Sequence, residues 1–151
     1  MRVLAIDLGS KRIGLALSDP TGTIATPLAT VDAQPAAGLV SRLAGIAHSH
    51  EVKRLVIGLP RRLDGSHGPE AAAARRMAGD LRRAAGVPVD LIDERMTSVA
   101  ADRALLSGGM KRNRRKAHVD RVAATLLLQG YLDGKNSERI STRDQGAGAP
   151  V

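Results

Sequence analysis

Residues 1–17 read MRVLAIDLGSKRIGLAL and predict two antiparallel strands joined by a tight turn. The first strand is an apolar run over 2–8, and the second alternates isoleucine and leucine with small residues over 13–17. Asp7 falls inside the first apolar run, so this segment carries a carboxylate into the core. An unpaired carboxylate in a medium of low dielectric constant costs several kcal/mol, so we expect a strong partner such as a metal ion, a set of buried hydrogen bonds or a phosphate.

The rest of the chain extends this hairpin into an α/β pattern. A third strand over 22–31 completes three antiparallel strands in a meander. The apolar spacing and the turn residues then predict a helix over 35–50, a buried strand over 54–58, a helix that begins at Pro69, a strand over 88–92, a helix from Thr97 or Ser98 to Leu106, and a last helix over 116–132. This is the element order of the ribonuclease H-like fold, with a mixed five-stranded sheet (three antiparallel strands, then parallel strands) flanked by helices on both faces.

The length and composition favour one globular domain. The chain has 151 residues, of which 43% are hydrophobic. We assign the domain to residues 1–133 and expect the polar, glycine-rich segment 134–151 to be a disordered tail. There is no cysteine, which excludes disulfides, thiolate nucleophiles and cysteine-bound zinc. The first apolar run is short and is interrupted by Asp7, so we expect no signal peptide, no membrane partner and a cytoplasmic protein.

The net charge favours nucleic acid as the partner. The formal charge is +8, and residues 111–116 form the dense basic run KRNRRK. There is no Phe or Trp and a single tyrosine, Tyr131, so we expect contacts to phosphates and recognition of shape in place of base stacking. The basic residues predicted to contact nucleic acid are Lys11, Arg12, Arg61, Arg62, Arg95, Lys111, Arg112, Arg114, Arg115 and Lys116.

Three acidic residues fall at the ends of three predicted elements. They are Asp7, Glu94 after the strand 88–92, and Asp120 near the start of the last helix. Asp120 shares a helix face with the apolar residues three, four and seven positions later, although an acid early in a helix is often only a solvated partner of the helix dipole. Clustered carboxylates repel one another, and Mg²⁺ or Mn²⁺ is the usual remedy when all ligands are oxygens. Such a site predicts phosphodiester hydrolysis.

Four stretches of the sequence, in order along 1–133, resemble the signatures of the YqgF family. They are DLGSKRIGLALSD at 7–19, GLP at 58–60 followed by DG at 64–65 and GP at 68–69, DERMTS at 93–98, and VDRVAA at 119–124. Members of this family are ribonuclease H-like nucleases, described both as pre-16S rRNA nucleases and as RuvX-type Holliday junction resolvases. The resemblance implies that Asp7, Glu94 and Asp120 form a catalytic triad that binds one or two divalent metal ions. Asp93 and His118 are accessory candidates, and a partner role for Asp93 toward Arg95 or a backbone amide is the alternative.

The expected function is a metal-dependent endonuclease acting on structured nucleic acid. The resemblance points to the 5′ end of pre-16S rRNA or to Holliday junctions, and a homodimer would suit a junction because a junction has two-fold symmetry. One alternative is a non-catalytic RNA-binding factor of ribosome assembly that uses the acids structurally. Another is a nucleotide-binding ATPase, since residues 7–10 also resemble a phosphate loop of the actin-like superfamily, but those proteins carry the fold twice and 151 residues hold one copy.

Overall fold

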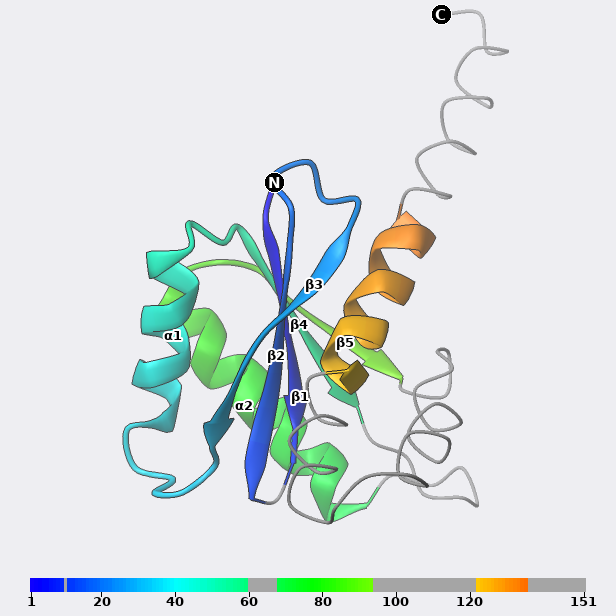
Figure 1. Ribbon diagram of the computed structural model, residues 1–151. Coiled ribbons are helices and arrows are strands. Elements are labelled where there is room, and N and C mark those ends of the chain that lie inside the picture. Colours follow the sequence, from blue (N-terminus) through cyan, green and yellow to red (C-terminus); the bar gives the residue numbers. More distant parts are fainter. Residues whose placement is uncertain (10, 60–67, 94–121, 136–151) are drawn as a thin grey trace, which may run out of the picture.

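The computed structural model describes residues 1–9, 11–59, 68–93 and 122–135, which form a five-stranded mixed sheet with helices on both faces (Figure 1). The strands are β1 (Val3–Leu8), β2 (Arg12–Ser18), β3 (Ala25–Asp32), β4 (Arg54–Leu59) and β5 (Val89–Asp93). The helices are α1 (Leu39–Ser49), α2 (Pro69–Ala85) and a third helix over 122–135. These bounds confirm the predicted order of elements within the described residues.

The sheet has the order β3-β2-β1-β4-β5. β2 pairs antiparallel with β1 and β3, whereas β4 pairs parallel with β1 and β5. The interior position of β4 between β1 and β5 explains its uninterrupted apolar sequence, because a parallel strand between two others is covered on both faces. The carboxyl ends of the parallel strands β1, β4 and β5 meet at one edge of the sheet, the usual place for a site in an α/β fold.

Each face of the sheet has its own apolar core, and the two cores divide β1 by alternation. Leu4 and Ile6 belong to the core beneath α1 and α2, whereas Val3 and Ala5 belong to the core beneath the helix 122–135. Figure 1 shows the helices that cover these two cores, with α1 and α2 on one side of the sheet and the helix 122–135 on the other. The prediction of helices on both faces is therefore confirmed.

The predicted first residues of one helix and one strand were wrong, each because of a local backbone feature. α1 begins at Leu39 and not at residue 35, because Gly38 before it has the left-handed φ of 81° and cannot continue a helix. β3 begins at Ala25 and not at residue 22, because the carboxylate of Asp19 accepts backbone hydrogen bonds from Thr23 at 2.8 Å and Ile24 at 2.9 Å and closes a turn. The Ile24 bond is the largest of several hydrogen bonds that hold the pKa of Asp19 well below its usual range.

The last helix continues to residue 135, two residues past the predicted domain boundary at 133. The predicted helix from Thr97 or Ser98, residues 116–121 of the predicted last helix, and the rest of the predicted tail lie outside the described residues. In the part of the chain that the structure describes, no helix has the length and apolar character needed to cross a membrane.

The turn between β1 and β2 depends on glycine at position 9. A β-carbon at Gly9 would overlap with the backbone carbonyl oxygen of Arg12, so Gly9→Ala must displace the turn. We expect this variant to lose about 2 kcal/mol of unfolding free energy, a common cost for a backbone clash that must be relieved. Gly45→Ala is the matched control, because a β-carbon at this exposed position of α1 has no neighbour within 4 Å.

We expect Gly45→Ala to raise the unfolding free energy by about 0.5–1 kcal/mol, since alanine replaces glycine inside a helix. Urea unfolding of both variants beside the wild type measures the two changes. An equal and small effect of both substitutions would show that the turn tolerates a side chain at residue 9.

Candidate active site

Asp7 is a buried carboxylate beside two glycines. Its exposure is 3%, and alternation along β1 turns it toward the face of the sheet that the helix 122–135 covers. Gly14 lies directly opposite Asp7 on β2, and Gly58 on β4 follows Ile57, which is the partner of Ile6. With glycine at both of these positions, neither neighbouring strand places a side chain directly beside the carboxylate, which already makes an interaction in the folded chain.

Two of the predicted basic residues lie at the same end of the sheet. Lys11 is exposed and Arg12 is half-buried, and they follow the turn that closes β1 onto β2. Arg12 is two residues before Gly14, so alternation places it on the same face of the sheet as Asp7. The backbone of Lys11 is fixed, because its carbonyl accepts a hydrogen bond of 2.9 Å from the amide of Ala33.

β5 presents its last two residues to opposite faces. Ile92 packs against the core beneath the helix 122–135, and Val89 packs against the core beneath α1 and α2. By alternation, Asp93 follows Val89 onto the face opposite Asp7. The structure therefore does not bring Asp93 and Asp7 together on one face.

The helix 122–135 runs in the opposite direction to β1. Near its end, Leu132 lines the same pocket as Val3, at the start of β1. The four residue steps from Val3 to Asp7 span ~13 Å of strand. The eight steps from Leu132 back to Ala124 span ~12 Å of helix. The first described turn of the helix therefore lies level with Asp7, and Figure 1 shows its yellow end toward the tips of β4 and β5.

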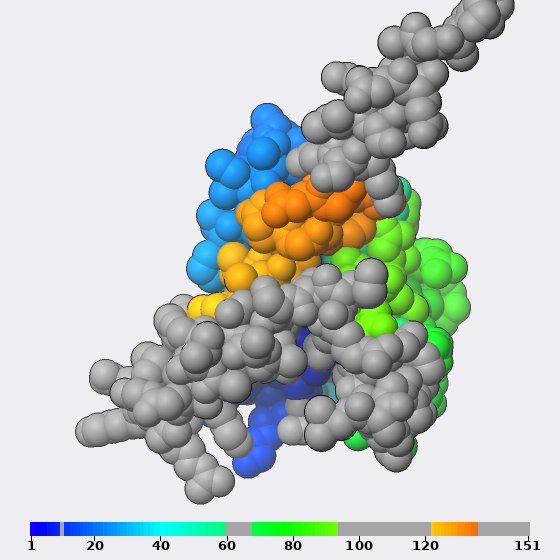
Figure 2. All heavy atoms as spheres, turned by 90° about the vertical axis from the view of Figure 1, so that its right-hand side faces the viewer, coloured from blue at the N-terminus to red at the C-terminus, as the bar shows by residue number. Residues whose placement is uncertain are grey.

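The contact between this helix and the sheet is made of small side chains. Ala123 and Ala124 share one buried cluster with Ala5, Ala16 and Val56, and each of these residues is at most 1% exposed. Alanine on alanine allows a helix to approach a sheet closely. Figure 2 shows this face, with the helix lying across the molecule and deep-blue atoms of the N-terminal segment visible below it.

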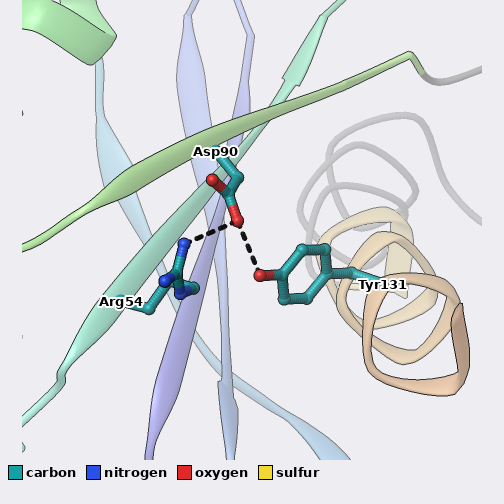
Figure 3. A network of polar contacts seen from close by, with 3 residues as sticks. All are labelled: Arg54, Asp90 and Tyr131. Atoms are coloured by element: carbon teal, nitrogen blue, oxygen red, sulfur yellow. Dashed lines mark hydrogen bonds and ion pairs between the residues drawn. The ribbon is translucent and has the colours of Figure 1, made fainter. Parts of the chain in front are cut away.

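A polar network holds the far end of the same helix (Figure 3). Asp90 on β5 accepts a hydrogen bond of 2.6 Å from the hydroxyl of Tyr131 and one of 2.9 Å from Arg54 on β4. On the other side, Gln129 accepts a hydrogen bond of 2.9 Å from the amide of Ala25 at the start of β3. The helix is thus tied to β3, β4 and β5 at the end away from Asp7. No local sequence pattern indicates this network, because its residues come from distant parts of the chain.

Tyr131 should contribute stability that depends on pH. Burial, followed by the hydrogen bond to Asp90, raises the pKa of Tyr131 to about 12 from the model-peptide value of 10.0. The folded chain therefore favours the neutral phenol, and this contribution is complete below about pH 10 and is lost as the pH rises through about 12. We expect Tyr131→Phe to lose about 1 kcal/mol of unfolding free energy at pH 7, because the half-exposed hydrogen bond is to a charged group.

Urea unfolding at pH 7 and between pH 10 and 11.5 tests this expectation. The stability of Tyr131→Phe should fall less steeply with pH in the alkaline range than that of the wild type. Equal alkaline slopes in the two proteins would contradict the role given to the phenol.

The other predicted site residues lie outside the described residues. They are Glu94, Asp120, His118, Arg61, Arg62, Arg95, Lys111, Arg112, Arg114, Arg115 and Lys116. Asp7 is the one member of the predicted triad that the structure describes. Within the described ranges, no group of three or more histidine, cysteine or acidic residues could hold a metal ion.

A family model and individual relatives were compared with this chain, and they agree on one family. The family model described as RuvX: Holliday junction resolvase matches residues 1–134. A relative from Moorella thermoacetica is 46% identical over 133 residues, which cover 88% of this chain and 95% of the relative. A relative from Pelotomaculum thermopropionicum is 40% identical over 151 residues, covering 99% of this chain and 98% of the relative. Both relatives are provisionally named pre-16S rRNA nucleases.

Solved structures show the same fold. RuvC from Thermus thermophilus matches with a TM-score of 0.57 and 17% identity, covering 89% of this chain and 97% of RuvC. The same protein in complex with a Holliday junction substrate matches with a TM-score of 0.57 and 19% identity, covering 89% of this chain and 96% of RuvC. This likeness confirms the predicted ribonuclease H-like fold.

Proposed function

Because this chain belongs to the RuvX family of Holliday junction resolvases, we propose that it is a divalent-metal-dependent endonuclease that hydrolyses phosphodiesters in structured nucleic acid. The proposal rests above all on Asp7, a carboxylate with 3% exposure beside two glycines at the edge where three parallel strands end. Glycine at the neighbouring position of both strands supports a role as a metal ligand over a purely structural one, because glycine allows a ligand to approach the backbone closely. The substrates that we propose are the 5′ end of pre-16S rRNA and the Holliday junction.

Glu94 is the second acid of the proposed site. The alternation of β5 supports this choice, because Asp90 and Ile92 face the helix 122–135 and residue 94 is the next position of that series. β5 is two strands from β1, so Glu94 would lie about 10 Å to the side of Asp7. A long acidic side chain suits that separation better than a short one.

Asp120 is the third acid. Ala123, Ala124 and Leu127 are buried against the sheet, and residue 120 precedes them by three, four and seven positions. A helix extended by one turn would carry Asp120 on this buried stripe. The direction of the helix, with its first described turn level with Asp7, supports a position for Asp120 at the same edge of the sheet.

Three carboxylates at this edge suit Mg²⁺ or Mn²⁺, since both ions prefer oxygen ligands. Bound there, one or two such ions would activate a water molecule and stabilise the charge that develops on the scissile phosphate. The carboxylates of Asp7, Glu94 and Asp120 would hold the ions. Lys11 and Arg12, at the turn beside Asp7, would neutralise the phosphates next to the scissile bond.

The remaining basic residues are proposed to hold the flanking backbone. Arg61 and Arg62 precede the amino end of α2, where backbone amides and the helix dipole favour a phosphate. Arg95 adjoins Glu94 in the chain. His118 is two residues before Asp120, and the basic run 111–116 precedes His118. These residues would supply most of the salt-dependent part of the affinity.

The identity of the substrate has consequences for the oligomeric state of the protein and for the cellular compartment in which it acts. A Holliday junction has two-fold symmetry, so cleavage of both strands favours a symmetric homodimer, whereas one active site is enough for an RNA end. Both substrates occur in the cytoplasm of the bacteria that carry the relatives, and we propose that compartment for this chain.

A cleavage assay on both substrates tests the proposed function. The purified chain is incubated with Mn²⁺ or Mg²⁺ and either a precursor RNA carrying the 5′ end of 16S rRNA or a four-way junction, with a linear duplex and a chelator as controls. We expect metal-dependent cuts in one or both structured substrates and none in the chelator control. Tight binding without any metal-dependent cut would favour the non-catalytic assembly factor instead.

A further inference from the structure

The outer face of α2 carries four exposed arginines in two pairs. Arg75 and Arg76 lie seven residues before Arg82 and Arg83. Seven residues are almost two turns of an α-helix, so Arg75 lies in line with Arg82, and Arg76 lies in line with Arg83. The row of Arg76 and Arg83 is opposite the buried stripe of the helix, and the row of Arg75 and Arg82 lies beside that stripe, which consists of Ala71, Ala74, Ala78, Leu81 and Ala85.

The positive charge of this face is only partly balanced. Arg83 pairs with Asp80 at 2.5 Å, while no acid pairs with Arg75, Arg76 or Arg82 among the residues that the structure describes. Positive charges gathered on one exposed face attract a polyanion through the field that they create together. This face is therefore prepared for a polyanion.

The space between the two rows of arginines is shallow. Ala72 and Gly79 are seven residues apart and lie between the rows on the helix surface. A β-carbon at Gly79 would meet Nη1 of Arg83 at 3.7 Å, so the guanidinium group of Arg83 lies beside the bare backbone of this glycine. A sugar-phosphate backbone that approaches this part of the surface would therefore meet the guanidinium group of Arg83 between the rows.

We propose that the outer face of α2 is a second phosphate-binding surface, which holds a double-helical arm of the substrate away from the scissile bond. The proposal rests on the proposed function, since it assigns the partner from the nuclease family. The arginine pairs are about 10.5 Å apart along the helix axis. At this separation the two pairs would contact two different phosphates of the backbone.

The position of α2 also restricts the shape of this substrate. α2 packs on the core that contains Leu4 and Ile6, whereas Asp7 turns toward the other face of the sheet. A straight duplex cannot contact both faces of one sheet. Contact with α2 during cleavage beside Asp7 therefore requires a nucleic acid that bends or branches, so that one arm passes around the edge of the protein.

Salt-dependent binding by the full chain tests this proposal. The double variant Arg75→Gln with Arg82→Gln removes two charges and keeps the helix, because glutamine and arginine have similar helix propensities. Arg2→Gln with Lys53→Gln is the matched control, since it removes the same charge near the starts of β1 and β4. The affinity for four-way junctions of DNA and of RNA is measured in a chelator against salt concentration, beside straight duplexes of equal length.

We expect the α2 variant to bind the junctions about tenfold more weakly at 100 mM salt, with a slope of log affinity against log salt that is smaller by about 1.8. The control variant should show neither change, and straight duplexes should show a smaller loss, because they cannot contact α2 and the face of Asp7 together. An equal loss in the control variant, an equal loss on straight duplexes, or no loss at all would overturn the proposal. Because binding is measured without metal and without cleavage, this result can be interpreted even if the proposed nuclease activity is not found.

Discussion

Asp7→Asn is expected to reduce the cleavage rate by a factor on the order of 10³ or more while the fold is retained. Asparagine has nearly the same shape as aspartate, so the packing of β1 against its neighbours is preserved. It lacks the negative charge that would hold a divalent ion beside Gly14 and Gly58. The rate is measured with Mn²⁺ on the substrate that the wild type cuts, and far-ultraviolet circular dichroism checks the fold.

The affinity of the Asp7→Asn variant for nucleic acid is the control for this prediction. Without metal, we expect it to lie within about twofold of the wild-type value, because phosphate contacts by basic residues dominate binding. Cleavage at the wild-type rate by a folded Asp7→Asn variant would contradict the site. A loss of binding as large as the loss of cleavage would show that Asp7 acts on binding and not on the chemical step.

The second large effect is expected where β5 ends, and it separates two adjacent acids. Glu94→Gln should reduce cleavage by a factor on the order of 10² to 10³, because it removes one of the proposed metal ligands. Asp93→Asn should change cleavage by less than about fivefold, because alternation along β5 places Asp93 on the face opposite Asp7. Single-turnover cleavage rates with saturating protein compare the two variants directly.

The melting temperatures of these two variants provide the control. A lower melting temperature for Asp93→Asn with nearly normal cleavage would agree with a structural role, since Asp93 already makes an interaction in the folded chain. The reverse outcome, with Asp93→Asn inactive and Glu94→Gln active, would contradict the assignment and would mean that the alternation of β5 breaks after Ile92.

Local patterns were enough to predict most of the fold. The apolar run and the alternation over residues 2–17 predicted the first hairpin, and the continuous apolar sequence of β4 predicted a central strand. The errors came from single backbone features. The left-handed conformation of Gly38 delays α1, and the hydrogen bonds accepted by Asp19 delay β3, and neither feature changes the hydrophobic pattern from which the helix and the strand were predicted.

The site could be predicted only in part, because its residues come together from distant parts of the chain. The cost of burying a carboxylate singled out Asp7 from the sequence, and its exposure of 3% agrees with that interpretation. That Asp93 lies on the face opposite Asp7 could be derived only from the pairing of β4 with β5 and from the two separate cores. The bond between Asp90 and Tyr131 joins residues 41 positions apart, and no local pattern predicts such a contact.

Titration calorimetry of Mn²⁺ is the most direct test of the central claim, which is that Asp7, Glu94 and Asp120 together hold a divalent ion. The wild type and the single variants Asp7→Asn, Glu94→Gln and Asp120→Asn are titrated at one pH. Each protein is mixed with the same uncleaved nucleic acid, from which metal ions have first been removed with a chelator. We predict that the wild type binds Mn²⁺ and that each variant binds it at least about tenfold more weakly, which corresponds to 1.4 kcal/mol or more. Equal Mn²⁺ affinity in the wild type and all three variants would contradict the claim.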